Sequence, residues 1–521
     1  MRENKINPKI MFSPIKKISH SMFIKMCCLI LILLGSASLL ANNLKITGVA
    51  VDQSTQLVTF TLSWENSWYL SSSPNNWDAV WVFVKFRQCS SNASTTASTH
   101  GTLSSTLSNH SYTNLEAMTS VTWNGSSGTT GSASQGASMD FTDGIMLRRS
   151  ATGSGSLSSS VSLKITNLPA SGTAITLNVF GIEMVYVPTA DFSLGDGNGT
   201  SGSYGKFGVA ATAAALPMSI TSSYETGAQT FYTYNLPTQT VTSVPAAWPK
   251  GNYGFYIMKY EISQGQYCMF LNDLITVAST NRYPSNYTTN RNRTYGINGS
   301  YSSDRPDRAQ NYLSWDDVSA YLDWACLRPL TESEYEKACR GTAAVVNLEY
   351  AWGSTSITAG LTFTNLGENG SETFTTASAN CTYNNQTFVN GDATTGPARV
   401  GIYATPSSNR VTAGASFYGV LDLTGNVREY YIGIHSTGAS NTFTRTWGDG
   451  SLDANGRHDV GGGWPAGSAT NADAATTNIV IDRGGSWNTT TTTFMNLSSR
   501  YHAYNATNYT RINTSGGRGG R

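Results

Sequence analysis

The stretch that decides the fold reads RPLTESEYEKACRG, residues 328–341. Thr331 can form a capping box with Glu334, because the threonine hydroxyl accepts the amide of the glutamate while the carboxylate reaches back to the cap. The apolar residues that follow share one helical face: Tyr335, Ala338 and Cys339. Gly341 can end the helix in a left-handed conformation that other residues avoid. The stretch therefore predicts a short, well-capped amphipathic helix.

Two further helices are predicted upstream, and both are short. One begins at Ser314, where Asp316 and Asp317 place carboxylates in the first turn, an arrangement that the helix dipole favours. Another spans residues 261–274 and carries apolar residues on one face. The rest of residues 181–521 is Gly-, Asn- and Thr-rich loop, which needs support from bound ions or dense tryptophan packing.

Short blocks that match one known family occur in order along residues 181–521. They are EMVYVP (183–188), FYIMKYEIS (255–263), SWDD (314–317), RPLTESEY (328–335), AWG (351–353), YGVLDLTGNVREY (418–430), RGGSW (483–487) and GGR (516–518). In this order they resemble the formylglycine-generating-enzyme (sulfatase-modifying-factor) domain, although Pro329 and Leu330 are swapped relative to the family pattern. The resemblance implies an irregular, loop-rich fold related to C-type lectins.

The chemistry of that family depends on cysteines that this chain lacks. The enzyme oxidises a sulfatase cysteine to formylglycine with a copper ion held by two thiolates, which suit soft Cu(I). Carried onto this chain, the two positions fall at Thr489 and Phe494, and no cysteine follows Cys381. We therefore expect neither bound copper nor formylglycine formation by this mechanism.

The family resemblance leaves two other enzymatic interpretations. Iron-dependent relatives of the family use a histidine cluster, but the histidines expected in the mature chain show no i, i+3 or i, i+4 pair: His100, His110, His435, His458 and His502. A divergent oxidase stays open as the alternative, and its discriminating feature is a pair of thiols or of histidines that faces the cleft.

Calcium is the metal that the resemblance favours, because hard cations bind carboxylates and turning main-chain carbonyls. The Gly-Asn-Val-x-Glu segment of the family implies a site with side-chain ligands Asp422 and Glu429 and carbonyl ligands Gly425 and Val427. A second family site would use Asn365 and the carbonyl of Leu366, without an identifiable acidic partner. In the alternative interpretation, Asp422 and Glu429 only satisfy loop amides.

The segment from Asn488 to Ser515 is dominated by Thr, Asn, Ser and Tyr. In lectin-like folds this final region displays side chains on the binding face, and tyrosine beside short hydrogen-bonding groups makes adaptable contact surfaces. The predicted ligand-binding residues are Trp487, Asn488, Tyr501, Tyr504 and Tyr509. The expected partner is a protein or a glycan at the cell surface; a plain polar loop is the alternative.

Three arginines accompany the family blocks: Arg483, Arg500 and Arg518. The planar fork of a guanidinium group can hold several loop carbonyls together. We expect these arginines to stabilise the loops rather than to bind a substrate.

Residues 42–180 have a different sequence pattern from residues 181–521, because apolar and polar side chains alternate there as in half-buried strands. VTFTLSW (58–64) and VSLKIT (161–166) alternate, whereas WVFVKF (81–86) is a continuous apolar run that suits a central strand. Together with the family-like domain over 181–521, these strands predict the α+β class: an antiparallel β-sandwich domain followed by a loop-rich, C-type-lectin-like domain.

The N-terminus has the pattern of a secretory signal peptide. Lys16, Lys17 and Lys25 precede the apolar run MCCLILILL (26–34), and small residues follow it. The run is shorter than the ~20 residues that span a bilayer. We predict a signal peptide over 1–41 and export to the periplasm, the cell surface or the medium of a bacterium, without a membrane-spanning segment.

Charged residues make up 12% of the chain and the formal net charge is +1. Without a basic stripe, the chain has no electrostatic means of holding nucleic acid. Seven cysteines, two of them in the predicted signal peptide, form no metal-binding spacing. The sequence predicts a secreted, non-catalytic binding or surface protein.

Overall fold

The computed structural model describes residues 43–118, 141–197, 206–209, 216–234, 239–364, 368, 370–434, 442–461, 463–465, 480–501 and 510–521. All of them belong to one compact unit, Leu40–Arg521. The predicted signal peptide lies outside the described residues. None of the helices in the described ranges is both long enough and apolar enough to cross a bilayer.

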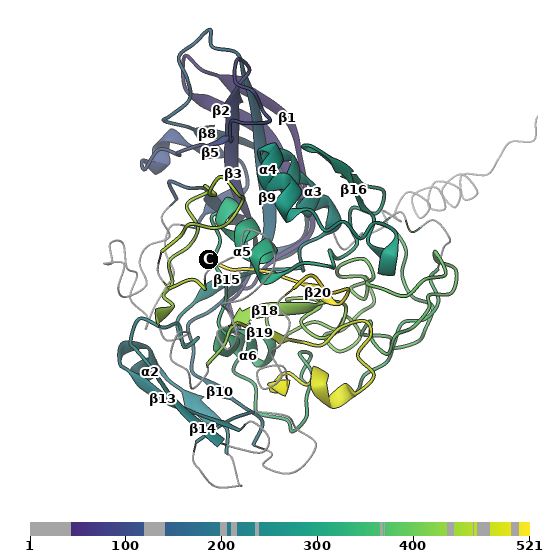
Figure 1. The fold of residues 1–521 in the computed structure, drawn as a ribbon. Helices are drawn as coiled ribbons and strands as arrows, with labels where there is room; N and C mark the ends of the chain where they lie inside the picture. The colour runs from purple at the N-terminus through teal and green to yellow at the C-terminus, as the bar shows by residue number, and fades with distance from the viewer. Residues whose placement is uncertain are drawn as a thin grey trace, which may run out of the picture. The chain divides into compact units, whose positions relative to one another are not determined.

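The first sheet has four strands in the order β1-β2-β8-β5 (Figure 1). The bounds are Lys45–Asp52 for β1, Leu57–Tyr69 for β2, Gly153–Lys164 for β8 and Ser111–Tyr112 for β5. Every second side chain of the first half of β2 is buried: Val58, Phe60, Leu62 and Trp64. The alternation predicted for this segment is confirmed.

The second sheet has the order β15-β9-β3-β7-β6, with β4 paired to β3. The bounds are Phe255–Met258 for β15, Ile175–Val187 for β9, Asp78–Gln88 for β3, Ile145–Arg149 for β7, Leu115–Ala117 for β6 and Thr99–His100 for β4. Alternate residues of β3, namely Val80, Val82 and Val84, pack against the buried face of β2 and β8. The two sheets therefore form the predicted sandwich, and β3 is its buried central strand.

Strand β9 connects the sandwich to the remainder of the fold. It runs across the domain boundary predicted between residues 180 and 181, and it pairs with β3 on one side and with β15 on the other. A second link is the indole of Trp81, which donates a 2.8 Å hydrogen bond to the carbonyl of Ala325. The sandwich and the loop-rich part thus share one sheet.

The predicted helices are present, and each begins with a capping box. Their bounds are Gln264–Asp273 for α3, Trp315–Trp324 for α5 and Glu332–Arg340 for α6. Helix α3 is shorter than predicted, because the hydroxyl of Ser263 caps it and leaves residues 261 and 262 outside. Helix α5 packs on the outer face of the second sheet, where Trp324 meets Phe83 edge-on at 5.2 Å. Two shorter helices are α2 (Ser222–Thr226) and α4 (Thr276–Arg282).

The remaining strands form small sheets among long loops. They are β10 (Phe192–Leu194) with β12 (Met218–Ile220); β11 (Lys206–Gly208), β13 (Gln229–Tyr234) and β14 (Gln239–Val244); β16 (Thr294–Ile297) with β17 (Ser300–Ser303); and β19 (Val480–Arg483), β18 (Arg428–Ile432) and β20 (Ser515–Gly516). Among the described residues, single turns of 3-10 helix lie at Leu107–Asn109, Thr289–Arg291 and Thr492–Met495. Helix α6 ends at Gly341 with φ +63°, where an added Cβ would lie 2.2 Å from the ring of Phe417. Only glycine fits there.

Candidate functional site

The predicted calcium loop, residues 422–429, leads directly into β18. Asp422, Gly425 and Asn426 all have positive φ, so the backbone turns tightly at these positions. A Cβ at Gly425 would lie 2.4 Å from the sulfur of Cys381, which explains the glycine. The loop carbonyls of Leu423 and Thr424 accept hydrogen bonds from Tyr335 and Cys381.

The carboxylate of Glu261 accepts two hydrogen bonds from this loop. It accepts hydrogen bonds from the side chain of Asn426 at 2.5 Å and from the amide of Val427 at 2.9 Å. Glu261 is fully buried. It therefore positions the loop and was not singled out by the sequence, because its partners lie 165 residues away.

The two predicted side-chain ligands are both buried and both have protein partners. Asp422 accepts a 2.5 Å hydrogen bond from the amide of Gly401. Glu429 forms an ion pair with Arg518 at 2.5 Å and accepts the hydroxyl of Tyr431. Part of the alternative interpretation thus holds, since these carboxylates do satisfy neighbouring donors.

The electrostatics of the site favour additional positive charge. Burial raises the pKa of Asp422 to about 6, although the Gly401 amide and Arg518 oppose the shift. Burial also raises the pKa of Glu429, and it raises the pKa of Glu261 well above its usual range with help from Asp422 and Glu429. Each of the three buried carboxylates interacts with the guanidinium group of Arg518, but only Glu429 is directly paired with it. The donors are all oxygens, the type that a hard divalent cation binds, but among the described residues the oxygens of Glu261, Asp422 and Glu429 do not all lie within 4.8 Å of one another.

The other predicted residues lie in different surroundings. Trp487 is 2% exposed and donates from its indole to the carbonyl of Asn513 at 3.0 Å, so the ring is part of the interior. Asn488 accepts a hydrogen bond from the hydroxyl of Ser486. Tyr501 stacks on Phe494, with ring centroids 3.9 Å apart. Asn365, Leu366, Tyr504 and Tyr509 lie outside the described residues.

Thr489 and Phe494 are the positions to which the sequence resemblance assigns the family's cysteines. The hydroxyl of Thr489 accepts a hydrogen bond from the amide of Ser486 at 3.0 Å. In return, the amide of Thr489 donates to the carbonyl of Ser486. Phe494 belongs to the 3-10 turn Thr492–Met495 and stacks on Tyr501. These residues therefore make a hydrogen-bonded turn and an aromatic stack.

The described cysteines form no disulfide with one another. Burial raises the pKa of Cys268 to about 11, and it also raises the pKa of Cys326, Cys339 and Cys381. Cys381 donates to the carbonyl of Thr424 at 3.3 Å, whereas Cys326 lies 3.5 Å from a ring nitrogen of His100. Burial of this kind disfavours the thiolate form that copper requires.

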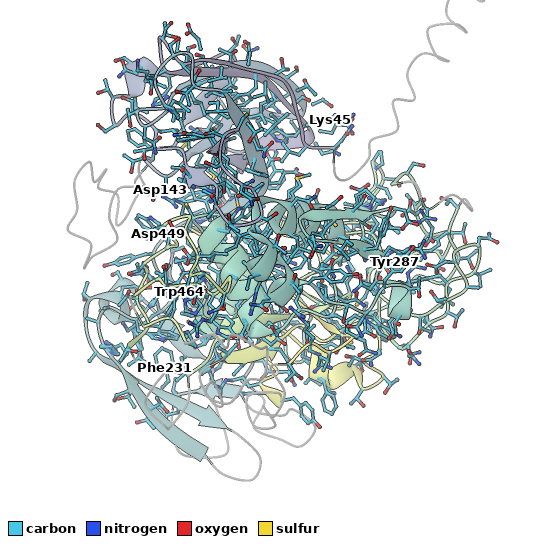
Figure 2. All side chains as sticks on the ribbon, turned by 45° about the horizontal axis from the view of Figure 1, so that its top comes forward. Lys45, Asp143, Phe231, Tyr287, Asp449 and Trp464 are labelled. Atoms are coloured by element: carbon cyan, nitrogen blue, oxygen red, sulfur yellow. The ribbon has the colours of Figure 1, made fainter. Side chains whose placement is uncertain are left out.

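A group of aspartates was missed by the sequence argument. Oxygens of Asp323, Asp449 and Asp459 lie within 4.8 Å of one another, and Figure 2 labels Asp449. Burial and the neighbouring Asp449 raise the pKa of Asp323 to about 8. Its oxygens accept the amides of Asp449 and Asp459 at 3.0 and 3.2 Å, which accounts for its burial. No local spacing could reveal the group, because residue 323 is 126 positions from its nearest partner.

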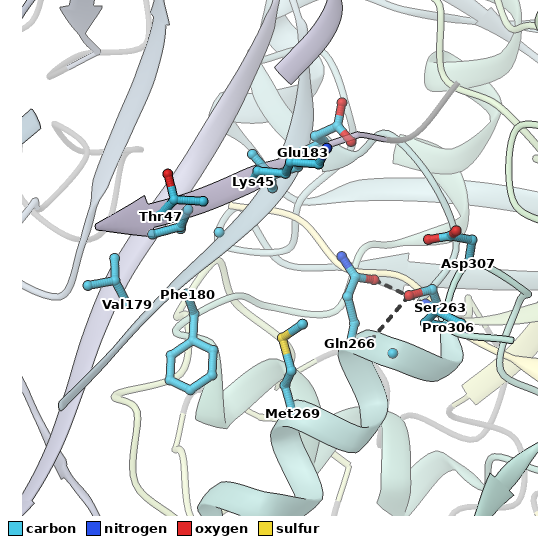
Figure 3. Close-up of a pocket in the computed structure, with 14 residues that line it drawn as sticks. Lys45, Thr47, Val179, Phe180, Glu183, Ser263, Gln266, Met269, Pro306 and Asp307 are labelled. Carbon is cyan, nitrogen blue, oxygen red and sulfur yellow. Dashed lines mark hydrogen bonds between the residues drawn. The ribbon is translucent and has the colours of Figure 1, made fainter. Parts of the chain in front are cut away.

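A pocket of about 400 Å³ opens between β1, β9 and α3 (Figure 3). Phe180 and Met269 give it an apolar wall, and Glu183 and Asp307 contribute carboxylates. Gln266, on the same rim, is held by Ser263 in the capping box of α3. Among the described residues, none of the predicted ligands lines this pocket.

One sequence comparison identifies a family. The profile described as the sulfatase-modifying factor enzyme 1-like domain matches residues 225–518, which is more than half of the chain. No curated protein matches the chain.

Proposed function

Because the chain belongs to the sulfatase-modifying factor enzyme 1-like family, we propose that it uses the family scaffold for binding rather than for formylglycine formation. In this proposal the protein is exported through its signal peptide and binds a protein or a glycan outside the cytoplasm. The family membership establishes the scaffold, and the arguments below concern what the scaffold does.

The observation that carries the proposal is the replacement of both copper ligands. A hydroxyl at Thr489 and a phenyl ring at Phe494 offer no soft donor to Cu(I). The cysteines that remain in the family domain are buried, and their raised pKa values disfavour thiolates. The scaffold thus keeps its loops without the sulfur pair that names the activity.

Calcium is the proposed cofactor, and its role is structural. Asp422 and Glu429 would bind it through carboxylates, and Gly425 and Val427 through carbonyls. A bound cation neutralises excess buried charge and fixes the loop that enters β18. This role is supported by the raised pKa values of the two carboxylates.

The proposed binding surface is the polar segment that follows Trp487. Because the indole of Trp487 is buried and hydrogen-bonded to Asn513, it anchors the base of this segment. Asn488 and Tyr501 are half-buried and supply polar and aromatic contact groups. Tyr504 and Tyr509 are the other two tyrosines proposed to bind the ligand. Tyrosine and asparagine suit adaptable recognition of a protein or a glycan.

A divergent oxidase is the second candidate, and one contact favours it. The sulfur of Cys326 lies 3.5 and 3.7 Å from the two ring nitrogens of His100. A cysteine beside a histidine is a common reactive arrangement. Against it, burial and Lys85 lower the pKa of His100 to about 3, so the imidazole is a weak base.

Metal analysis and an oxidation assay on the same preparation separate these candidates. We expect stoichiometric calcium, no copper, and no conversion of a cysteine-containing sulfatase peptide. Copper in stoichiometric amount together with peptide turnover would overturn the proposal. Asp422→Asn and Glu429→Gln should lower the calcium content, whereas Asp453→Asn, at a partly exposed turn carboxylate, is the matched control and should not.

Two further measurements test export and binding. N-terminal sequencing of the exported protein should begin near residue 42. An array of cell-surface glycans and proteins should show a ligand whose binding is weakened by Tyr504→Ala and Tyr509→Ala together. Retention of the N-terminus inside the cell, or unaltered binding by the double variant, would contradict these parts of the proposal.

A further inference from the structure

Three buried charged side chains meet on neighbouring strands at the junction of the sandwich and the family domain. Strand β9 lies between β3 and β15. Asp78 on β3 pairs with Val185, two residues from Glu183 on β9, and the amide of Lys259 donates to the carbonyl of Glu183 at 2.9 Å. Because side chains alternate along a strand, this register places all three on one face of the sheet.

The geometry brings a primary amine against two carboxyl groups. Lys259 Nζ lies 3.3 Å from Asp78 Oδ2 and 3.3 Å from Glu183 Oε1. The residues are 3%, 0% and 5% exposed for Lys259, Asp78 and Glu183 respectively. The indole of Trp68 lies over the amine, with its ring centroid 5.0 Å away.

Asp78 is held rigidly by the strand β2 and its continuation. Oδ1 accepts the hydroxyl of Ser67 at 2.8 Å and the amide of Trp68 at 2.9 Å, and Oδ2 accepts the indole of Trp64 at 3.1 Å. Two donors on one oxygen are the arrangement that stabilises an oxyanion in acyl chemistry. The other oxygen faces the lysine.

We propose that Lys259 and Asp78 condense to form an intramolecular isopeptide bond, with Glu183 carrying the proton. A proton first moves from Lys259 to Oδ2 of Asp78, which gives an amine and a carboxylic acid. The amine attacks Cγ and a C–N bond forms, while the charge on Oδ1 is stabilised by Ser67 and Trp68.

The second half of the reaction removes water. Glu183 accepts a proton from the new nitrogen and delivers a proton to Oδ2, so that the bond between Cγ and Oδ2 breaks. One amide and one water molecule account for every atom, and no oxidation state changes. Glu183 also lines the pocket beside β1, through which the water can leave (Figure 3).

The buried setting changes the proton affinity of all three groups. Burial raises the pKa of Glu183 to about 7 and that of Asp78 above its usual range, so carboxylic acid forms are accessible. Burial lowers the pKa of Lys259, but Tyr260, Glu183 and Asp78 raise it more, and the net direction is upward. The resting state is therefore an ion pair. The reaction proceeds slowly, through the small population in which Lys259 is an amine and Asp78 a carboxylic acid, until the amide accumulates.

The resulting cross-link would join residues that are 181 positions apart. It would tie β3 of the sandwich to the end of β15, at the entrance to the family domain. Such a bond adds a covalent constraint to the sheet that both parts share, as a disulfide does for other folds.

Mass spectrometry of the full chain tests the proposal without any substitution. The purified, aged protein should be lighter than its sequence by the mass of one water molecule. Trypsin should fail to cut at Lys259 and should release a branched species that joins residues 46–85 to residues 251–282. A full-length mass with normal cleavage at Lys259 would overturn the proposal, and so would a water loss located elsewhere.

Variants then assign the roles. Lys259→Arg should abolish the branched species, and Glu183→Gln should leave most of the chain unlinked. Asp78→Asn should give the same branched product with loss of ammonia in place of water. Lys206→Arg, in a second buried Lys–Asp pair with Asp196 at 2.5 Å, is the matched control and should leave the cross-link intact. Full cross-linking of Glu183→Gln would overturn the role given to Glu183.

Discussion

Between the two sheets of the sandwich, most buried side chains are aliphatic or aromatic and Asp78 is a charged exception, whereas around α6 they include many guanidinium and carboxylate groups. The sandwich core contains Val58, Leu62, Val82 and Leu163. The surroundings of α6 contain the residues Glu332, Glu336, Arg340, Arg483 and Arg500, all of them buried. Both regions exclude water, but one buries mainly apolar side chains and the other buries paired charges.

The difference follows from how each region satisfies its backbone. Strands pair their amides and carbonyls with each other, so most of the side chains inside the sandwich can be apolar. Loops leave carbonyls without such partners. Arg483 donates to the carbonyl of Leu497 at 2.6 Å, Arg500 to that of Ile434 at 2.7 Å, and Arg518 to that of Leu421 at 2.8 Å. The expectation that these arginines stabilise loops is confirmed, and it explains where many of the chain's few charges reside.

The largest effect should come from breaking this buried network. Arg483→Met removes one partner of Glu332 and one of Glu336, each 2.8 Å away, and leaves these buried carboxylates to Arg500 and Arg340. We expect a loss of about 3–5 kcal/mol in the free energy of unfolding. Urea denaturation followed by tryptophan fluorescence measures it. A loss below about 1 kcal/mol would show that the network is dispensable and that loop packing carries the region.

A cavity in the sandwich core should cost somewhat less, and it should respond differently to salt. Leu163→Ala deletes a fully buried side chain between the sheets, and we expect a loss of about 3 kcal/mol. Because no charge is involved, this loss should be the same at low and high ionic strength. A clear dependence on salt would contradict the contrast between an apolar and an ionic interior.

Local features were predictable from the sequence, and long-range ones were not. The capping boxes at Ser314 and Thr331 involve residues three positions apart, so the sequence alone contains both partners. The link between Asp78 and Lys259 joins β3 to the end of β15, and only the strand register reveals it. Trp487 illustrates a subtler limit: the sequence pattern made it a predicted ligand-binding residue, but nothing local shows that its ring is buried.

The path of β9 was hidden for a related reason. The sequence pattern does change near residue 180, since the alternation of apolar and polar residues ends and the family blocks begin there. The chain nevertheless stays in one strand up to Val187. A strand that serves two cores changes its side-chain pattern without changing its backbone, so composition alone suggests a boundary where the sheet has none.

The junction between the two regions should respond to acid through His100 on β4. Burial and Lys85 lower the pKa of this histidine to about 3 in the folded state, against about 6.5 when unfolded. A depressed pKa gives stability that is present above the unfolded value and is lost as the pH falls toward the folded value. Between about pH 6 and pH 4 the protein should lose about 2 kcal/mol through this group.

The variant His100→Gln isolates that contribution. It removes the titrating ring, so the free energy of unfolding should fall less steeply with decreasing pH than in the unsubstituted protein. Denaturation curves at several pH values measure the difference in slope, which is independent of what the substitution costs at neutral pH. Equal slopes would show that protonation of His100 is not linked to unfolding.

The smallest effect should come from an ion pair that lies in the loop-rich region but remains in contact with water. Arg457 pairs with Asp453 at 2.6 Å, and the arginine side chain is 37% exposed. We expect Arg457→Gln to cost below about 1 kcal/mol, and less at high salt, because solvent already stabilises both charges. Set beside Arg483→Met, this variant separates charge from burial. If both variants lower the free energy of unfolding equally, the loop-rich region depends on ion pairs wherever they lie. If only Arg483→Met lowers it, the arginines around α6 are needed because the carboxylates beside them are buried.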